Sequence, residues 1–133
     1  MPALPIASLY AALCGLLILT LSARVVFLRR SARIGIGTGD HPELTRRIRV
    51  HGNAIETIPI ALILLLLAEA GGSALWLLHG CGAGLVLSRV LHAIGLTQSA
   101  GYSPGRFWGT LLSWIVMLAL SLLPLQPLGS VHS

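Results

Sequence analysis

The chain has 133 residues, of which 55% are hydrophobic and 10% are charged, with a formal net charge of +5. A soluble domain carries about 25% charged residues, so this composition excludes a protein whose whole surface faces water. The length leaves no room for a large soluble domain beside a membrane part, and we expect one domain over residues 1–133. All nine basic residues are arginines that mostly flank apolar segments, which favours anionic headgroups or an anionic ligand over nucleic acid.

Four apolar segments follow one another, each close to the roughly 20 residues that a membrane-spanning helix needs. They predict an all-α integral membrane four-helix bundle with helices at about 4–28, 42–69, 74–96 and 104–123. We expect the first segment to be a retained helix, because it lacks the basic start of a secretory signal. Cys14 and Cys81 stand alone within apolar runs, so we expect small buried hydrophobes and no metal site.

The arginines indicate how the bundle is oriented. Seven surround the first connection and one follows the third, whereas the second connection and both ends carry none; the eight are Arg24, Arg29, Arg30, Arg33, Arg46, Arg47, Arg49 and Arg106. The positive-inside rule predicts that the first and third connections are cytoplasmic and that both termini lie on the opposite side. We expect such a protein in a bacterial inner membrane or an equivalent one.

Start signals mark two of the helices. Asp40 is predicted to be the N-cap of the second helix, with Pro42 in its first turn and Glu43 as a capping-box carboxylate. Ser103 precedes a proline in the same way and is predicted to open the fourth helix. Pro59 lies inside the second helix, where it removes one backbone hydrogen bond and is expected to bend the helix.

Glycines at a spacing of four residues occur in the last two helices. Gly80 and Gly84 share one face of the third helix, and Gly105 and Gly109 share one face of the fourth. Glycine pairs at this spacing allow two helix backbones to approach each other closely. We therefore expect both pairs to lie at helix contacts.

Polar residues inside the apolar spans are the candidates for function: Asn53, Glu56, Arg89 and His92. A charged side chain at the bilayer centre costs about 2.5–3.5 kcal/mol on insertion scales, so such residues call for an explanation. On the second helix, Arg46, Arg49, Asn53 and Glu56 follow an i, i+3, i+7, i+10 spacing. This spacing places them in a stripe about 80° wide on one helix face.

Residue counts place Glu56 and Arg89 at the same depth. Glu56 lies 13 residues before Glu69, at the end of its helix, and Arg89 lies 15 residues after Ala74, where the next helix starts. At about 1.5 Å per residue, both are roughly 20 Å from the same membrane face and are predicted to pair. Two interpretations remain open. In the first, the pair is an ion pair whose sole role is to hold two helices together. In the second, the stripe, Arg89 and His92 line a polar pocket that opens to the cytoplasm. The excess of arginine favours the pocket, with an anionic ligand.

Arg106 gives an independent indication of an anion. If Ser103 caps the fourth helix, Arg106 occupies its first turn, where the helix dipole disfavours a cation by roughly 0.5 kcal/mol. Two explanations are open. The arginine serves topology, as a basic residue at a cytoplasmic helix end, or an anion lies beside it.

Taken together, these motifs resemble a known family. The segment Arg49-x-x-x-Asn53-x-x-Glu56, with Pro59 soon after, resembles the second helix of the MAPEG proteins, the membrane-associated proteins of eicosanoid and glutathione metabolism. Arg89-x-x-His92 resembles the third-helix motif of the family's prostaglandin E synthase branch. Arg106 sits where the family places an arginine at the start of the fourth helix. The resemblance covers nearly the whole chain and is that of a bacterial-type, microsomal glutathione transferase-like member.

The resemblance implies a homotrimer that holds glutathione between neighbouring subunits near the cytoplasmic face. By position, Glu56 would bind the ammonium group of glutathione and Arg49 a carboxylate, with Asn53 beside them. Arg89 and His92 would add contacts to the same ligand. A further contact would come from an arginine at the end of the first helix, Arg29 or Arg30.

The resemblance assigns the catalytic role to Arg106, which would stabilise the glutathione thiolate. The chemistry of the ligand agrees with this assignment. Glutathione carries two carboxylates, one ammonium and a thiol whose pKa is close to the free cysteine value of about 8.5. An arginine beside the sulfur would lower the pKa of that thiol and so raise the thiolate fraction. The thiolate could then attack a lipophilic electrophile that arrives through the bilayer.

The chain departs from the family pattern at two positions. Leu96 stands where many members have a tyrosine one turn after the third-helix histidine, and Thr57 replaces a tyrosine of the leukotriene branch. Tyr102 is expected near the pocket mouth, and His79 has no evident role. These departures leave the particular eicosanoid reaction, and catalysis itself, open.

Three functions therefore compete. The first is a glutathione-dependent transferase or peroxidase that acts on a lipophilic small molecule or lipid. The second is a non-catalytic lipid-binding or scaffold member of the same fold. The third is a small four-helix multidrug transporter, but that class carries its key carboxylate in the first helix, and here residues 4–28 contain none. In each case the expected partners include membrane lipids and exclude nucleic acid.

Overall fold

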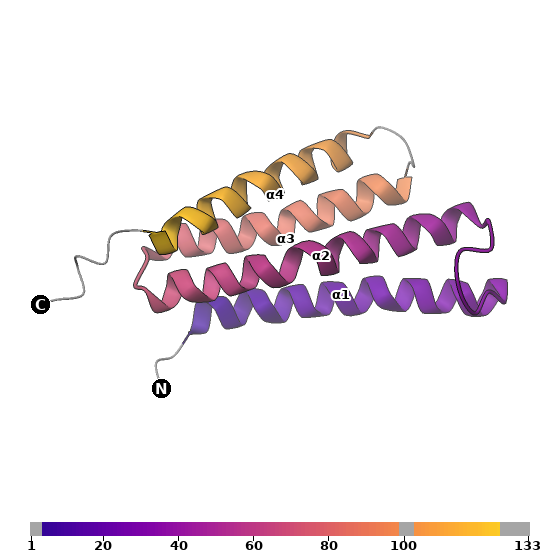
Figure 1. Cartoon of the computed structure of the whole chain (residues 1–133), viewed down its shortest axis with the longest axis horizontal. Coiled ribbons are helices and arrows are strands. Elements are labelled where there is room, and N and C mark those ends of the chain that lie inside the picture. Colours follow the sequence, from indigo (N-terminus) through magenta and orange to yellow (C-terminus); the bar gives the residue numbers. More distant parts are fainter. Residues whose placement is uncertain (1–3, 99–102, 126–133) are drawn as a thin grey trace, which may run out of the picture.

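The computed structural model describes residues 4–98 and 103–125. It contains α1 (Pro5–Ala32), α2 (Pro42–Ala70), α3 (Leu75–Gln98), α4 (Pro104–Leu122) and the short 3-10 helix η1 (Leu123–Leu125) (Figure 1). The predicted all-α fold of four helices is confirmed, and each predicted boundary lies within four residues of the observed one. Tyr102 lies outside the described residues.

The helices run alternately in opposite directions along the bundle (Figure 1). At one end α1 and α3 stop and α2 and α4 start; we call this the arginine end. At the other end, the turn end, Gly71 and Gly72 join α2 to α3, α1 starts and α4 stops. The two connections that arginines flank in the sequence therefore lie at the same end of the molecule.

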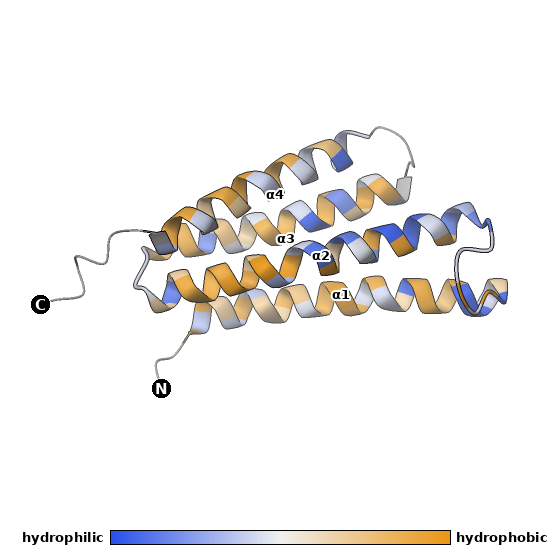
Figure 2. Ribbon diagram, viewed as in Figure 1, coloured by the Kyte–Doolittle hydropathy of each residue, from blue (hydrophilic) through white to orange (hydrophobic). Residues whose placement is uncertain are grey.

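All four helices have the length and the apolar composition that crossing a membrane requires. Hydrophobic residues cover most of their length, whereas hydrophilic residues gather where α1 stops and α2 starts (Figure 2). Large apolar side chains are exposed around the bundle, among them Leu19 (65%), Trp76 (75%) and Trp114 (70%). Apolar side chains on the outside are stable in lipid, so the outward faces match a hydrocarbon solvent.

The core of the bundle is built on one stripe of α2. Its buried residues recur every three or four positions and are Val50, Ala54, Ile58, Ala61, Leu65 and Ala68. This recurrence matches 3.6 residues per turn, so the stripe stays on one face of the helix. The alanine side chains in this stripe are small, so a neighbouring helix can approach the backbone of α2 closely. The other faces of α2 lie outside this core stripe.

Glycine holds α3 and α4 together near the arginine end. A Cβ atom on Gly109 would come within 2.7 Å of the backbone nitrogen of His92 and the carbonyl oxygen of Ser88. A Cβ on Gly105 would meet the carbonyl oxygen of Leu91 at 3.0 Å, so this predicted pair is confirmed at a helix contact. Gly95 of α3 faces α4 equally closely, because a Cβ there would overlap the start of α4.

The other predicted glycine pair is half correct. A Cβ on Gly84 would lie 2.8 Å from the side chain of Val116 in α4, which places Gly84 at a helix contact. Gly80 is exposed, and a Cβ there would meet nothing within 4 Å. The prediction for Gly80 is therefore wrong, because the helix contact begins one turn further along α3.

The N-caps differ from prediction at α2 and agree at α4. The cap of α2 is His41, whose Nδ1 accepts a hydrogen bond from the Leu44 amide at 3.1 Å. Asp40 has a left-handed backbone (φ 56°) and precedes the cap, so the predicted aspartate cap is wrong. The predicted capping box is absent too, because Glu43 pairs with Arg47 one turn later, at 2.7 Å. Ser103 caps α4 as predicted, accepting from the Arg106 amide at 3.2 Å.

At the turn end, polar groups from three helices satisfy one another. The Glu69 carboxylate, in the last turn of α2, accepts hydrogen bonds from the amides of Ile6 (3.0 Å) and Ala7 (2.5 Å) in the first turn of α1. The cap residue of α1 itself has no capping side chain, so Glu69 takes over that role from another helix. The Tyr10 hydroxyl lies 3.0 Å from Nδ1 of His79, which gives His79 a structural role that links α1 to α3.

Candidate functional site

A cavity of about 230 Å³ lies between α2, α3 and α4 near the arginine end. We call it the anion cavity, and its lining residues are Thr45, Arg46, Arg49, Asn53, His92, Leu96 and Arg106. Three of them are arginines and none carries a carboxylate. A concave site with three fixed cations attracts anions more strongly than isolated surface charges do, because its low-dielectric walls focus the field.

The α2 wall of the cavity includes three of the four residues of the predicted polar stripe. Arg46, Arg49 and Asn53 recur at the helical spacing and all line the cavity. Arg49 is exposed, whereas Arg46 and Asn53 are half-buried. The Nε atom of Arg46 is buried and has no hydrogen-bond partner among the described residues. A buried guanidinium nitrogen without an acceptor is unusual in proteins and is consistent with a place for a ligand oxygen.

Glu56, the last member of the stripe, lies elsewhere. Its side chain is exposed and does not line the anion cavity. It follows Asn53 by three residues, and this turns it about 60° further from the core-facing stripe. Within the described chain no ion pair joins Glu56 to Arg89, so the predicted pair is not formed. Counting residues gave the two groups the same depth, but it did not give the rotation of each helix about its axis.

Arg89 instead belongs to a buried polar network behind the cavity. Its guanidinium is 4% exposed and donates hydrogen bonds to Asn53 Oδ1 and Ser113 Oγ. Weaker contacts at 3.4 Å reach the Gly109 carbonyl and Ser88 Oγ, and the two serine hydroxyls lie 3.0 Å apart. Every hydrogen-bond partner that the described residues give Arg89 is neutral, so no carboxylate among them balances this buried cation.

Arg89 also determines how Asn53 can act. A guanidinium has only donors, so the Asn53 atom that faces Arg89 must be the amide oxygen. The two N–H donors of the Asn53 amide are therefore what this side chain can offer to the cavity that it lines. Guanidinium groups and an amide N–H group all require an acceptor, so the chemistry of the site selects carboxylate or other oxygen-rich ligands.

The α4 wall is set by packing at its first turn. Ser103 fixes the start of the helix, and Gly95 allows that start to approach α3. Arg106 follows in the first turn, is half-buried, and lines the cavity opposite the arginines of α2. His92 and Leu96, one turn apart on α3, complete the wall between them. Leu96 thus lines the cavity at the position where the resemblance predicts a tyrosine.

The arginines at the end of α1 do not reach this cavity. Arg29 donates to the carbonyl oxygens of Gly37 (2.7 Å) and Ile34 (3.4 Å), so it closes the connection to α2. Arg30 is exposed on α1. Within one chain, then, the structure brings together Arg49, Asn53, His92 and Arg106, with Arg89 behind Asn53; Glu56 and the α1 arginines remain outside.

Ser88 and Ser113 were missed by the sequence analysis. A serine changes the hydropathy of an apolar helix only slightly, so a single serine gives little signal in the sequence. The usable signal was position: Ser88 directly precedes a buried arginine, and an arginine in a membrane span needs acceptors. Searching the other spans for hydroxyl groups at the depth of Arg89 would have found Ser113.

Comparison with known proteins adds two findings. The model of the MAPEG family matches residues 7–126, which include all four helices apart from the first two residues of α1. The inner membrane protein YecN of Escherichia coli (strain K12) is 43% identical over 90 residues, which cover 68% of this chain and 69% of YecN. YecN of Escherichia coli O6:H1 matches to the same extent.

Proposed function

The chain belongs to the MAPEG family, and from this premise we propose that it is a glutathione-dependent transferase or peroxidase of lipophilic electrophiles. The four spanning helices and the inner membrane relative support an integral, multi-pass membrane protein. The observation that carries the proposal is the anion cavity, which three arginines and the Asn53 amide line without a carboxylate.

Glutathione fits the charges of this cavity. Its two carboxylates are acceptors, and the cavity offers the guanidinium groups of Arg46 and Arg49 and the N–H donors of Asn53. Arginine keeps its charge even when it is partly buried, which suits a site at the edge of the bilayer. Arg89, held behind Asn53, adds positive potential and orients the amide.

The site gains its remaining groups in a homotrimer. Glu56 and Arg30 are exposed on the surface of a single chain. A carboxylate on a membrane helix is costly unless it has a partner, so the exposed Glu56 supports a neighbouring subunit or a ligand against this face. In the proposed trimer, Glu56 binds the ammonium group of glutathione, and Arg29 or Arg30 comes from the adjacent copy.

Arg106 is the proposed catalytic residue. Its guanidinium at the cavity wall holds the glutathione sulfur as a thiolate, because a nearby cation lowers the pKa of a thiol. In conjugation, the thiolate forms a bond to an electrophilic carbon while the leaving group departs with its electron pair. In peroxide reduction, the thiolate attacks one oxygen and the O–O bond breaks. The alkoxide takes a proton, and a second glutathione converts the sulfenic acid to a disulfide with release of water.

The proposed orientation places the anion cavity on the cytoplasmic side. Eight arginines lie at or near the arginine end, around the first and third connections. The positive-inside rule assigns such connections to the cytoplasm. Glutathione would then reach the cavity from water, while the electrophile would reach it from the bilayer.

Glutathione binding by the purified protein tests the ligand. We expect saturable binding that weakens about 30-fold in Arg49→Gln, because a hydrogen bond to a charged group contributes about 2 kcal/mol. Glu56→Gln should also weaken binding. The matched control is Arg33→Gln, which removes an exposed arginine from the same end of the bundle but outside the cavity. Equal affinity in Arg49→Gln and Arg33→Gln would defeat the site assignment.

The thiolate absorbance of bound glutathione tests catalysis. We expect the thiol to titrate below its free pKa of about 8.5, so that thiolate is present at neutral pH. Arg106→Gln should raise the pKa of the bound thiol, and the absorbance should then appear only at higher pH. The non-catalytic alternative, a lipid-binding scaffold, is favoured by Leu96, an apolar side chain at the α3 wall of the cavity where many family members have a tyrosine. It predicts no thiolate signal in the unmodified protein.

A further inference from the structure

A second hollow lies on another face of α3. It has a volume of about 330 Å³, runs between α1 and α3, and is lined by Leu17, Thr20, Leu21, Arg24, Val90, Ala93 and Ile94. We call it the α1–α3 groove. On α3, its residues are centred about 120° around the helix from Arg89, His92 and Leu96, so the groove does not belong to the anion cavity.

The groove has an apolar wall and one charged end. Its α1 residues follow an i, i+3, i+4, i+7 spacing, with Arg24 last and closest to the arginine end. From Leu17 to Arg24 the groove extends about 10 Å along the helix axis. That length accommodates the first part of an acyl chain, and the α3 side, which includes the small residue Ala93, is apolar throughout.

Arg24 lies at the depth of lipid phosphates. α1 has 28 residues and therefore spans about 42 Å, roughly 12 Å more than the hydrocarbon core of a bilayer. Residues Pro5 to Ala23 carry no charge, whereas Arg24, Arg29 and Arg30 follow them, so we place the excess length at the arginine end. Counted from Pro5, Arg24 is the twentieth residue of α1, so the hydrocarbon core of the bilayer ends beside it. The final turns, with Arg29 and Arg30, then lie among headgroups.

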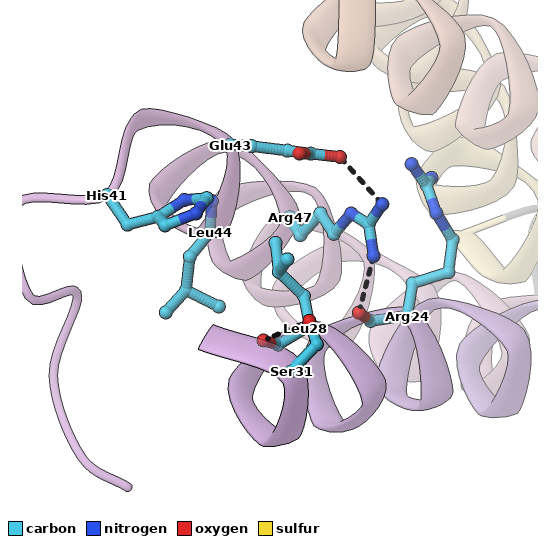
Figure 3. Close-up of polar contacts among 7 residues, drawn as sticks. All are labelled: Arg24, Leu28, Ser31, His41, Glu43, Leu44 and Arg47. Carbon is cyan, nitrogen blue, oxygen red and sulfur yellow. Dashed lines mark hydrogen bonds and ion pairs between the residues drawn. The ribbon is translucent and has the colours of Figure 1, made fainter. Parts of the chain in front are cut away.

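The charge around Arg24 favours an anion. Arg47 of α2 reaches across to α1 and donates to the carbonyl oxygen of Arg24 at 2.9 Å (Figure 3). Glu43 pairs with Arg47, and it is the acid in the one ion pair between side chains of the described residues. Arg24, Arg47 and Glu43 together carry a formal charge of +1, and Arg24 is the one of them that lines the groove. A headgroup phosphate would balance this charge.

We propose that the α1–α3 groove binds an acidic phospholipid of the surrounding bilayer. One acyl chain lies against Leu21 and Val90, and the phosphate meets Arg24 at the groove mouth. This site is independent of the proposed glutathione site. It requires only the groove, the depth of Arg24 and the local excess of positive charge.

Lipid retention by the detergent-purified protein, measured by native mass spectrometry, tests the proposal. The probes are phosphatidylglycerol and phosphatidylcholine with identical acyl chains, added at equal concentration. We expect the unmodified protein to retain phosphatidylglycerol about tenfold better. Arg24→Gln should abolish this preference. The matched control Arg33→Gln removes the exposed arginine that follows the last residue of α1 and does not line the groove, and it should keep the preference.

A second variant tests the groove itself. Thr20 is exposed and lines the groove, so Thr20→Trp should fill it without disturbing the core. We expect Thr20→Trp to lose bound lipid of both headgroup types while its helix content stays unchanged. Equal preference in Arg24→Gln and Arg33→Gln would overturn the proposal in favour of diffuse attraction. Unchanged retention in Thr20→Trp would overturn it too, as would a disulfide between two copies of Thr20→Cys, which would mean that a neighbouring chain covers the groove.

Discussion

The two ends of the bundle differ in how far their polar side chains are paired with groups of the same chain. At the turn end, Glu69 accepts two amide hydrogen bonds from α1, and Tyr10 pairs with His79. Each of these three side chains has a partner from another helix. At the arginine end, three arginines line one cavity without a carboxylate among its lining residues.

We interpret the difference as one between a structural role at the turn end and the proposed binding role at the arginine end. Groups that satisfy one another within the chain hold helices together and have little left to offer a ligand. At the other end, the proposed anionic ligand would balance the positive charge of a cavity whose lining includes no carboxylate. Changes at the turn end should therefore alter stability, and changes at the arginine end should alter binding.

The largest expected effect comes from the glycine contact that builds the cavity wall. Gly109→Ala would drive a methyl group into the backbone of α3, and overpacking of this kind costs about 3 kcal/mol. We expect a clear loss of thermal stability in detergent and, because α4 carries Arg106, a loss of anion binding as well. The matched control is Gly80→Ala, which adds the same methyl group in open space on α3. If both variants melt together, the close α3–α4 contact is not important for stability.

The next variant makes the arginine end resemble the turn end. Asn53→Asp gives Arg89 the carboxylate that it lacks and removes the amide donors from the cavity. We expect glutathione affinity to fall about 30-fold, which corresponds to about 2 kcal/mol. Thermal stability should not fall, because a buried cation gains an ionic partner. Calorimetric titration and a melting curve on the same preparation measure both.

The control for that substitution is Thr45→Asp. It adds the same charge to the same cavity without touching Arg89. An anion site should weaken in both variants, but only Asn53→Asp should change the stability of the buried network. Undiminished binding in both would show that the cavity does not hold the anionic ligand.

Much of this fold was predictable because a membrane simplifies the sequence signal. Apolar runs had to be helices, and their lengths gave four spans. Caps were less predictable: both Asp40 and His41 can accept a hydrogen bond, and the left-handed backbone of Asp40 moved the cap by one residue. Side-chain pairing was less predictable still. Counting residues gives the depth of a side chain in the membrane, whereas pairing also depends on the rotation of each helix about its axis. That rotation places Glu56 outside the cavity, and Arg89 donates hydrogen bonds to Asn53 and Ser113 instead.

A smaller effect is expected at the turn end. Glu69→Gln keeps one acceptor oxygen but removes the charge that caps α1, and loss of such a cap costs about 1 kcal/mol. We expect a lower melting temperature with unchanged glutathione affinity. Glu43→Gln is the comparison at the arginine end, since its exposed pair with Arg47 should contribute less. A change in glutathione affinity with Glu69→Gln would contradict the separation of the two ends.

The smallest expected effect tests whether the network behind the cavity positions its groups. Ser113→Ala removes one acceptor from the Arg89 guanidinium and leaves the cavity lining untouched. Arg89 would then hold Asn53 less firmly, and we expect glutathione affinity to fall about threefold, which is about 0.7 kcal/mol. Ser113→Thr keeps the hydroxyl and should restore most of the affinity, which a purely steric role of the serine does not predict. If alanine and threonine at this position behave alike, Arg89 is held by Asn53 and the fold alone, and the hydroxyl contributes nothing to the site.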